Sequence, residues 1–184
     1  GRVTVVGKFW QEDMSWFEGQ PTENAPAKRY GTALFRLDER CVVVYGGRNF
    51  NEHFNDCWLI ITESLTWVPI RMGGDIPPAL CFASSDVTEN GRMLLFGGST
   101  ADAAASNDLY LADGAPLLSL SQNKAIQWQQ ERAGGAVPPP RSGATLNMVN
   151  GRAVLFGGCN KSDFYNDIHY YDLEGKKWTK PSVG

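Results

Sequence analysis

Histidine, the side chain most often used for general acid–base catalysis, is sparse in this 184-residue chain. It has two histidines, of which His53 lies in a polar segment and His169 alternates with its neighbours in a strand-like run. We expect His53 to be a solvated loop side chain and His169 to pack in a half-buried strand. The chain contains no G-x-S-x-G motif and no Walker A loop, so neither a serine nucleophile nor a phosphate-binding loop is predicted.

The composition also argues against metal and nucleic-acid chemistry. The four cysteines are widely spaced, without a C-x-x-C pair or a histidine at metal-ligand spacing, and stand at Cys41, Cys57, Cys81 and Cys159. No zinc site, no other metal and no cofactor is therefore predicted, and reduced thiols favour a cytoplasmic or nuclear protein. A net charge of -3 gives no electrostatic basis for binding nucleic acid. Binding to a membrane is not predicted, because no apolar run reaches the roughly 18 residues of a spanning helix.

Candidate binding residues gather in two short segments in which aromatic side chains stand among polar ones. The segments are RNFNEHF (48–54) and CNKSDFY (159–165). Aromatic and arginine side chains dominate the hot spots of protein interfaces. The residues predicted to bind a protein or peptide partner are Arg48, Phe50, His53, Phe54, Lys161, Phe164 and Tyr165.

The elements that must position these segments are repeated along the chain. An apolar run ending in two glycines occurs three times, as CVVVYGG, RMLLFGG and RAVLFGG. Each run is followed by Asn-Asp and then by a tryptophan, which lies 11, 20 and 11 residues after the Asp. Three concordant copies of these landmarks predict a repeat architecture. Trp16 precedes Arg29 by 13 residues, as Trp128 precedes Arg141, so residues 1–20 are predicted to end a preceding unit.

Each unit has the sequence pattern of four antiparallel strands. The apolar runs are four to seven residues long, rich in Val, Leu, Phe and Tyr, and bounded by turn residues. The strands of the first unit are predicted near 30–37, 41–45, 57–61 and 66–70. Asn90-Gly91 and Asn150-Gly151 each lie between two runs and predict two-residue hairpins, because both residue types tolerate positive φ.

A lone four-stranded sheet of this length cannot cover both of its faces, whereas such sheets stacked around an axis form a β-propeller. The apolar strand with Gly-Gly, the Asn-Asp and the tryptophan together resemble the kelch repeat, and the resemblance covers nearly the whole chain. It implies an all-β fold, a kelch-type β-propeller segment with three complete four-stranded blades plus the last strands of a fourth. The blades are predicted at residues 26–70, 78–131 and 138–180 of a single partial domain, 1–184.

Three recurring features are predicted to be scaffold. Glycine can leave a crowded strand end because it has no Cβ, and Asn-Asp suits the turn that enters the third strand. A tryptophan on the fourth strand is expected to pack between neighbouring blades. These structural residues are Gly46, Gly47, Gly97, Gly98, Gly157, Gly158, Asp56, Asp108, Asp167, Trp16, Trp67, Trp128 and Trp178.

The middle unit departs from the repeat in two places. Cys81 stands where the other units have Arg29 and Arg141, so any role of that arginine is expected to be absent there. A longer segment before Trp128 contains the apolar run PLLSL, which is predicted to be either a flap against the blade or a patch for a partner. An arc of three blades leaves apolar faces and strand edges exposed. The chain is therefore expected to be part of a larger propeller or to be completed by another chain, including by self-association.

The kelch resemblance also has implications for the arginines. In kelch propellers of the ubiquitin-ligase adaptor kind, arginines at the start of the first strand and just after Gly-Gly bind acidic peptides. Arg29, Arg141 and Arg48 match those positions, and a guanidinium group can hold a carboxylate through two hydrogen bonds. In the alternative interpretation, Arg29 and Arg141 pair with a carboxylate such as the Asp of Asn-Asp and hold the blade together.

The predicted function is that of a non-catalytic protein-interaction module without a cofactor. Its partner is expected on the face formed by the b–c loops, which join the second and third strands of a blade, and the d–a connections, which lead to the next blade. One alternative is the propeller portion of a larger multidomain enzyme or ubiquitin-ligase adaptor whose active domain lies outside this chain. Another is a catalytic propeller of the oxidase or metal type, but Ile60 replaces the histidine of the iron motif E-x-x-x-D-x-x-x-H after Glu52 and Asp56.

Overall fold

The computed structural model describes residues 3–5, 17–19, 24–119 and 124–182. The regular structure of these residues is strand, apart from one short 3-10 helix, η1 (Ala115–Leu118). Strands β1 (Val3–Val5) and β2 (Phe17–Gly19) form an antiparallel pair within the predicted end of the preceding blade. Trp16 lies outside the described residues.

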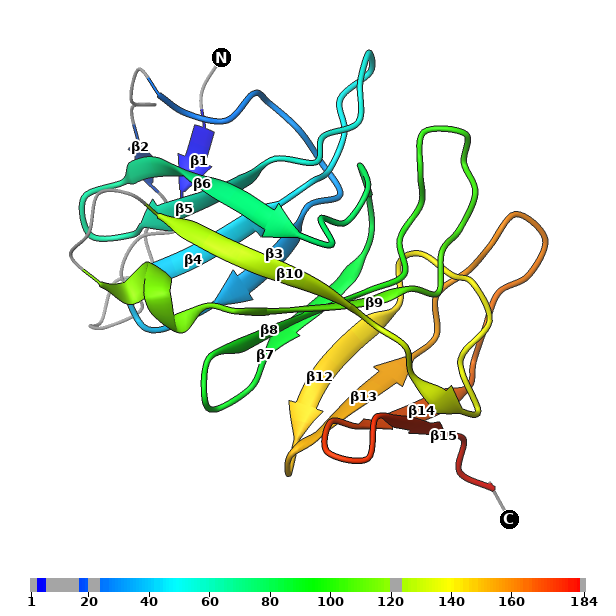
Figure 1. Ribbon diagram of the computed structural model, residues 1–184. Helices are drawn as coiled ribbons and strands as arrows, with labels where there is room; N and C mark the ends of the chain where they lie inside the picture. Colours follow the sequence, from blue (N-terminus) through cyan, green and yellow to red (C-terminus); the bar gives the residue numbers. More distant parts are fainter. Residues whose placement is uncertain (1–2, 6–16, 20–23, 120–123, 183–184) are drawn as a thin grey trace.

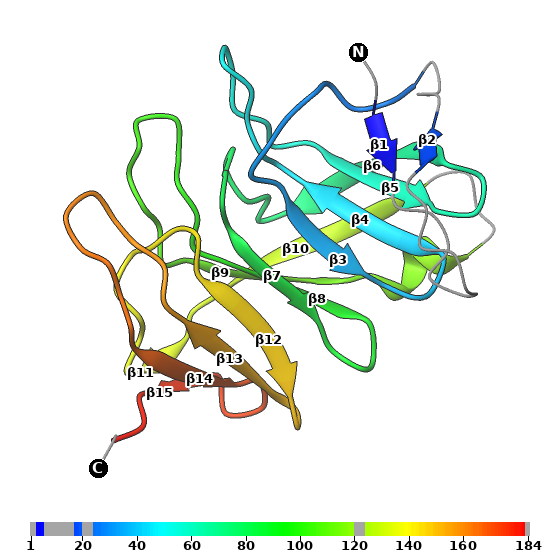
Figure 2. The ribbon, with the colours of Figure 1, turned by 180° about the vertical axis from the view of Figure 1, so that it is seen from behind.

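Three consecutive antiparallel meanders of four strands follow, and each is one blade (Figures 1 and 2). The first blade consists of β3 (Ala33–Arg36), β4 (Cys41–Tyr45), β5 (Cys57–Ile61) and β6 (Thr66–Gly74). The second consists of β7 (Ser84–Val87), β8 (Arg92–Phe96), β9 (Leu109–Asp113) and β10 (Ala125–Glu131). The third consists of β12 (Thr145–Val149), β13 (Arg152–Phe156), β14 (Ile168–Asp172) and β15 (Lys177–Thr179). The predicted all-β propeller segment is confirmed.

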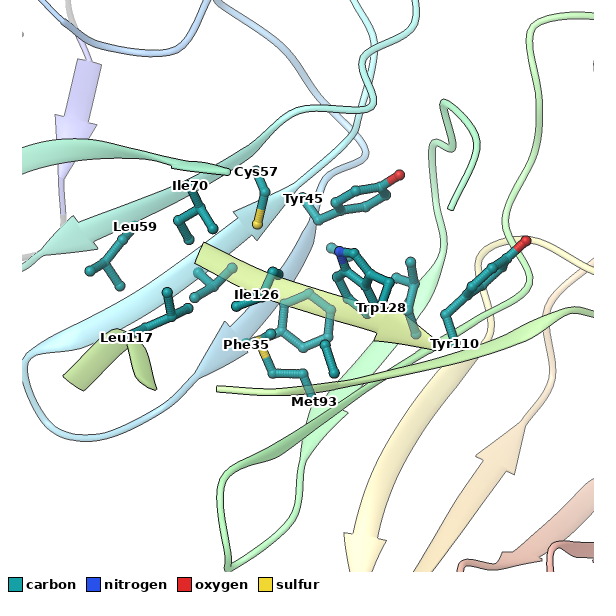
Figure 3. Close-up of a cluster of buried hydrophobic side chains, with 14 of the residues drawn as sticks. Phe35, Tyr45, Cys57, Leu59, Ile70, Met93, Tyr110, Leu117, Ile126 and Trp128 are labelled. Carbon is teal, nitrogen blue, oxygen red and sulfur yellow. The ribbon is translucent and has the colours of Figure 1, made fainter. Parts of the chain in front are cut away.

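The hydrophobic core lies between the blades. One cluster of buried side chains joins the first blade to the second, and another joins the second to the third. Trp128 of β10 is buried against the first blade. Its ring centroid lies 6.1 Å from that of Phe35 and 5.6 Å from that of Tyr45 (Figure 3). Trp178 of β15 is buried in the same way, 5.1 Å from Phe96 of the second blade. Both rings are thus buried between neighbouring blades, whereas Trp67 of β6 is half-buried.

A short parallel pairing also joins the blades, and the sequence did not indicate it. After leaving its own blade, β6 continues to Gly74 and pairs in parallel with β10 of the second blade. In the same way β11 (Gly134–Gly135) pairs in parallel with β15 of the third blade. A Cβ at Gly74 or Gly135 would lie 2.2 Å from a tryptophan carbonyl oxygen, so only glycine fits this close approach.

Gly135→Ala is therefore expected to weaken the contact between the second and third blades. The added Cβ would meet backbone at 2.2 Å, and the φ of +82° is unfavourable for alanine. We expect the free energy of unfolding to fall by about 2 kcal/mol or more in denaturant titrations. Gly134→Ala is the matched control, because no atom lies within 4 Å of its added Cβ. Equal losses in the two variants would contradict the steric explanation.

The glycine pairs at the ends of the second strands mark points where successive blades touch. All six glycines have φ between +65° and +94°. A Cβ at Gly46 would lie 2.6 Å from the carbonyl oxygen of Leu80, and one at Gly97 would lie 2.5 Å from that of Arg141. Leu80 and Arg141 belong to the connecting segments that lead into the following blades. At Gly46 and Gly97, glycine is therefore required by the approach of the next blade as well as by the turn.

The two Asn-Gly dipeptides form different turns. The two-residue hairpin predicted at Asn150-Gly151 is present, with φ of +50° and +75°. The hairpin predicted at Asn90-Gly91 is wrong, because the connection spans residues 88–91. There the Thr88 hydroxyl accepts a hydrogen bond from the backbone N–H of Arg92 at 2.9 Å. This side-chain bond replaces a backbone bond of the ladder and widens the turn.

The described part of the extra segment in the middle blade is a flap, the first of the two predicted alternatives. Helix η1 buries Leu117 in the core between the first two blades, while Leu118 stays exposed. The ammonium group of Lys124 donates a hydrogen bond to the carbonyl oxygen of Leu117 at 2.6 Å and another to that of Ser119. These bonds hold the segment closed against the blade. Residues 120–123 of the segment lie outside the described residues.

Candidate binding face

The b–c loops of the three blades project from the same edge of the molecule (Figures 1 and 2). They span residues 46–56, 97–108 and 157–167. The d–a connections reach the same edge, because they lead into the first strands there. Each loop is anchored by a short ladder, which in the first blade pairs Tyr30 with Arg48 and Arg48 with His53. We call this edge the binding face because it is the edge at which the sequence predicts that a partner binds.

The same ladder corrects the alignment of the middle blade. Cys81 pairs with Ser99 in the way that Tyr30 pairs with Arg48, so Cys81 is the counterpart of Tyr30. The prediction that Cys81 replaces the arginine was therefore wrong by one residue.

Leu80 is the residue that occupies the arginine position. Its carbonyl oxygen accepts a hydrogen bond from Gly47 N at 2.8 Å, as the carbonyl oxygen of Arg141 does from Gly98 N at 2.9 Å. The sequence carried a signal for this register. Leu80 and Arg141 both stand seven residues after the first glycine of the preceding Gly-Gly, at positions 73 and 134.

Arg29 is held inside the first blade. Its guanidinium group forms a two-point ion pair with Asp56, with one contact between Nη2 and Oδ2 at 2.9 Å. It also donates to the carbonyl oxygen of Gly46 at 3.0 Å and lies 3.8 Å from the ring centroid of Phe54. Burial acts to raise the pKa of the Asp56 carboxyl, but hydrogen bonds from Arg29 and Trp58 outweigh it and lower the pKa.

Arg141 has the same arrangement in the third blade. Its Nη1 and Nη2 lie 2.6 and 3.2 Å from the carboxylate oxygens of Asp167, and Nη1 also donates to the carbonyl oxygen of Gly157 at 2.9 Å. The guanidinium carbon lies 4.0 Å from the ring centroid of Tyr165. The side chains of Arg29 and Arg141 are only 6% and 0% exposed.

These contacts assign four of the predicted binding residues to the scaffold. Arg29 and Arg141 form the blade-holding ion pairs of the alternative interpretation, so their donors are directed to acceptors of their own blade. Phe54 and Tyr165 are the half-buried rings on which the guanidinium groups stack, a geometry that favours cation–π attraction. Phe54 and Tyr165 are therefore not the exposed aromatic side chains that the sequence predicts.

The middle blade replaces this whole arrangement. Leu80 and Ser106 occupy the positions of the arginine and the aromatic ring. Asp108 accepts a hydrogen bond from the Ser106 hydroxyl at 2.9 Å and from the Gln130 amide at 3.0 Å. The aromatic residue before Asn-Asp therefore accompanies the arginine in the first and third blades and is absent with it in the second.

His169 is buried, as the packing prediction expected, but it also has polar partners. Its Nε2 lies 2.9 Å from a carboxylate oxygen of Asp167, and its Nδ1 lies 3.1 Å from the carbonyl oxygen of Ala136. Both neighbouring atoms are hydrogen-bond acceptors. His169 therefore links the Asp167 ion pair to the connection that enters the third blade.

The Asp167 ion pair makes a prediction about acid stability. The hydrogen bond from Arg141 lowers the pKa of the Asp167 carboxyl well below its ordinary value, assisted by His169 and opposed by burial. A carboxyl with a lowered folded-state pKa contributes stability that is complete above its unfolded pKa, about 4, and is lost as the pH falls below it. We expect the difference in unfolding free energy between the wild type and Asp167→Asn to shrink between pH 5 and pH 2. A difference that stays constant over this range would contradict the assignment.

Four of the predicted residues remain accessible on the binding face. Phe50 and Phe164 are 94% and 91% exposed. Phe50 lies at the tip of its b–c loop, whereas Phe164 pairs with Cys159 at the base of its own loop, the position that His53 has in the first blade. Lys161 is exposed and donates to the carbonyl oxygen of Asp102 at 3.4 Å, which connects the second and third b–c loops. Arg48 is half-buried.

His53 does not match the solvated side chain that the sequence predicts. It is half-buried, and its Nε2 is covered without a hydrogen-bond partner among the described residues. The backbone of His53 pairs with that of Arg48 at the base of the loop, whereas Phe50 lies at its tip.

The described residues contain no cluster of three or more His, Cys, Asp or Glu side chains that could hold a metal ion. All four cysteines are free, and Cys57 and Cys81 are buried. Burial raises the pKa of both buried thiols, so they are poor nucleophiles. Among the described residues, no helix combines the length and apolar character needed to cross a bilayer.

Stacked four-stranded blades with a tryptophan buried between them define a β-propeller segment. The chain belongs to the Kelch-repeat family: the model of the KLHDC2/KLHL20/DRC7 Kelch-repeats domain matches residues 5–115 and 62–184. Protein binding is typical of this family.

Curated relatives support the assignment. A putative adagio-like protein 2 from Oryza sativa subsp. japonica is 34% identical over 122 residues, which is 66% of this chain and 18% of the relative. The Rho GTPase-activating protein gacHH of Dictyostelium discoideum is 31% identical over 151 residues, 78% of this chain and 9% of the relative. Host cell factor of Drosophila melanogaster is 29% identical over 183 residues, 89% of this chain and 11% of the relative. The chain thus spans less than a fifth of the length of each.

Proposed function

We propose that this chain is a non-catalytic protein-interaction module that binds a partner on the face formed by the b–c loops and the d–a connections. The observation that carries the proposal is the pair of phenylalanines, Phe50 and Phe164, which are almost fully exposed on two b–c loops of the same edge. Large aromatic side chains exposed on a rigid support are typical of protein interfaces. The Arg48 guanidinium at the base of the first loop adds a site for a carboxylate, so acidic segments are the favoured partner class.

In the relatives, the matched region is less than a fifth of a longer protein. The match to a Rho GTPase-activating protein supports the alternative in which such a propeller is the binding part of a larger enzyme. An adaptor role, in which the propeller selects the partner for a separate catalytic domain, uses the same face. In both cases this chain supplies recognition rather than chemistry.

The proposal is tested by affinity capture with the full-length protein from extracts of cells that express it. Arg48→Ala, Phe50→Ala and Phe164→Ala are combined in one variant, and recovery of each partner is quantified by mass spectrometry. The control combines Arg40→Ala and Leu118→Ala, which remove an exposed arginine and an exposed apolar side chain from the opposite edge. We expect the first variant to lose partners that the control retains. Equal recovery by both variants would show that the binding face is wrong.

We also infer that the isolated chain associates through the outer face of its third blade. Phe156 and Ile168 are exposed there, whereas their counterparts in the middle blade, Phe96 and Leu109, are buried against the third blade. An apolar sheet face of this kind favours association. Light scattering is expected to show a mass that rises with concentration and is reduced by Phe156→Asp. A monomer at all concentrations would contradict this inference.

A further inference from the structure

Phe82 occupies a position at which both other blades have glycine. The backbone φ is +56° at Phe82, +68° at Gly31 and +67° at Gly143. The conformation is fixed from both sides, since Phe82 N donates to Gly31 O at 2.7 Å and Phe82 O accepts from Gly143 N at 2.8 Å. The stacking of the blades therefore imposes a left-handed conformation that is strained for a residue with a Cβ.

The Phe82 side chain does not offset this strain by filling the core. Phe82 is 45% exposed and Tyr30 is 46% exposed. Their ring centroids lie 5.9 Å apart, and the ring planes are tilted by 54°. Edge atoms of the Phe82 ring lie 3.2–3.3 Å from the position that a Cβ on Gly31 would take. The two rings thus form one aromatic surface across the junction of the first and second blades, on the binding face.

A free cation stands next to this surface. The Arg48 guanidinium carbon lies 5.9 Å from the centroid of the Tyr30 ring, and its Nε donates to the carbonyl oxygen of Asn49 at 3.3 Å. Within the described part of the chain Arg48 has no carboxylate partner, in contrast to Arg29 and Arg141. Its outer nitrogens are therefore the guanidinium donors of this face that can hold a carboxylate of a ligand.

We propose that Tyr30 and Phe82 form an aromatic platform at the base of the b–c loops, which receives an aromatic or proline side chain of an extended peptide carrying a neighbouring carboxylate that Arg48 binds. Aromatic rings and proline stack on exposed rings with little loss of conformational freedom. The left-handed backbone at Phe82, with φ of +56°, directs its ring toward that of Tyr30. This inference rests on the proposed function and adds to it two residues and the chemistry of the peptide.

The test uses random peptides displayed on phage, selected against the immobilised wild-type chain. We expect selection of peptides in which an aromatic residue or proline stands near Asp or Glu. One selected peptide is then synthesised with a fluorophore, and its Kd is measured by fluorescence polarisation. Phe82→Gly and Arg48→Ala are each expected to weaken binding by about tenfold or more, the effect of losing a hot-spot side chain. Phe82→Tyr, which keeps the ring, is expected to retain binding.

The melting temperature separates a binding role of Phe82 from a structural one. Phe82→Gly restores the residue that the other two blades have at this position, so its melting temperature is expected to equal or exceed that of the wild type. A lowered melting temperature with an unchanged Kd would overturn the platform.

The same selection also distinguishes failure of the platform from failure of the proposed function. In one outcome, the selected peptides bind Phe82→Gly like the wild type but fail to bind the variant in which Arg48, Phe50 and Phe164 are all alanine. That result would overturn the platform alone. Peptides that bind both variants like the wild type would overturn the binding face itself, as would a selection that enriches nothing.

Discussion

Replacing Trp128 by alanine is expected to lower the free energy of unfolding by about 4 kcal/mol, within the range for deleting a large buried aromatic side chain. The ring is buried against Phe35 and Tyr45 of the preceding blade, and its indole N–H points at the sulfur of Met72 at 3.3 Å. Its removal leaves a cavity between two blades, where the sheets on both sides are held by their own ladders and cannot collapse freely. For a chain of this size the melting temperature is expected to fall by roughly 8–16 °C.

Trp67→Ala is the matched control, because Trp67 has the same place on the fourth strand of the first blade. Trp67 pairs with Ile60 on the third strand of the first blade. Trp128 pairs with Ala112, which has the same position on the third strand of the second blade. Trp67 is only half-buried in the described structure, so its loss is expected to cost about half as much. Urea denaturation followed by circular dichroism measures both variants without depending on tryptophan fluorescence. Equal losses would indicate that the tryptophans act through strand propensity rather than through packing between blades.

The strands were predictable because local pattern and tertiary environment agree in them. β4 and β5 have the bounds expected from the sequence, since both are apolar runs bounded on each side by turn residues. The parallel pairing of β11 with β15 was not predictable in the same way. Gly134 and Gly135 have no intrinsic preference for strand, and their extended form comes from the edge of the next blade.

The candidate site was less predictable because one chemical group suits two roles. A guanidinium fork binds a carboxylate equally well whether it belongs to a ligand or to the same blade, so the motif alone left Arg29 and Arg141 undecided. The deciding signal lay in the residue before Asn-Asp. It is Phe54 or Tyr165 where the arginine is present and Ser106 where Leu80 replaces it.

The strained residue was hidden by a one-residue error of alignment. With Cys81 placed at the arginine position, Phe82 falls opposite Tyr30 and Ser142, and no conflict is visible. With Leu80 there, Phe82 falls opposite Gly31 and Gly143, and a positive φ at a phenylalanine is expected. Hydrogen bonds between blades fix this register, and they join residues far apart in the sequence.

Replacing Arg141 by leucine is expected to lower the free energy of unfolding by about 3 kcal/mol, because it leaves a buried carboxylate without its main partner. The Asp167 side chain is 12% exposed and would keep only His169 and Lys180, the latter at 3.5 Å. Arg29→Leu is the control in the first blade. Asp56 is 40% exposed and can be solvated by water, so a loss of about 1 kcal/mol is expected there. Thermal and urea unfolding at pH 7 measure both.

The middle blade provides the design for a partial rescue of Arg141→Leu. Leucine and serine stand there at the positions of the arginine and the aromatic ring, and the Ser106 hydroxyl bonds Asp108 at 2.9 Å. The double variant Arg141→Leu with Tyr165→Ser reproduces this pair in the third blade. It is expected to recover about 1 kcal/mol relative to Arg141→Leu, the contribution of one hydrogen bond to a carboxylate. A double variant less stable than Arg141→Leu would show instead that Tyr165 packs independently of the arginine it covers.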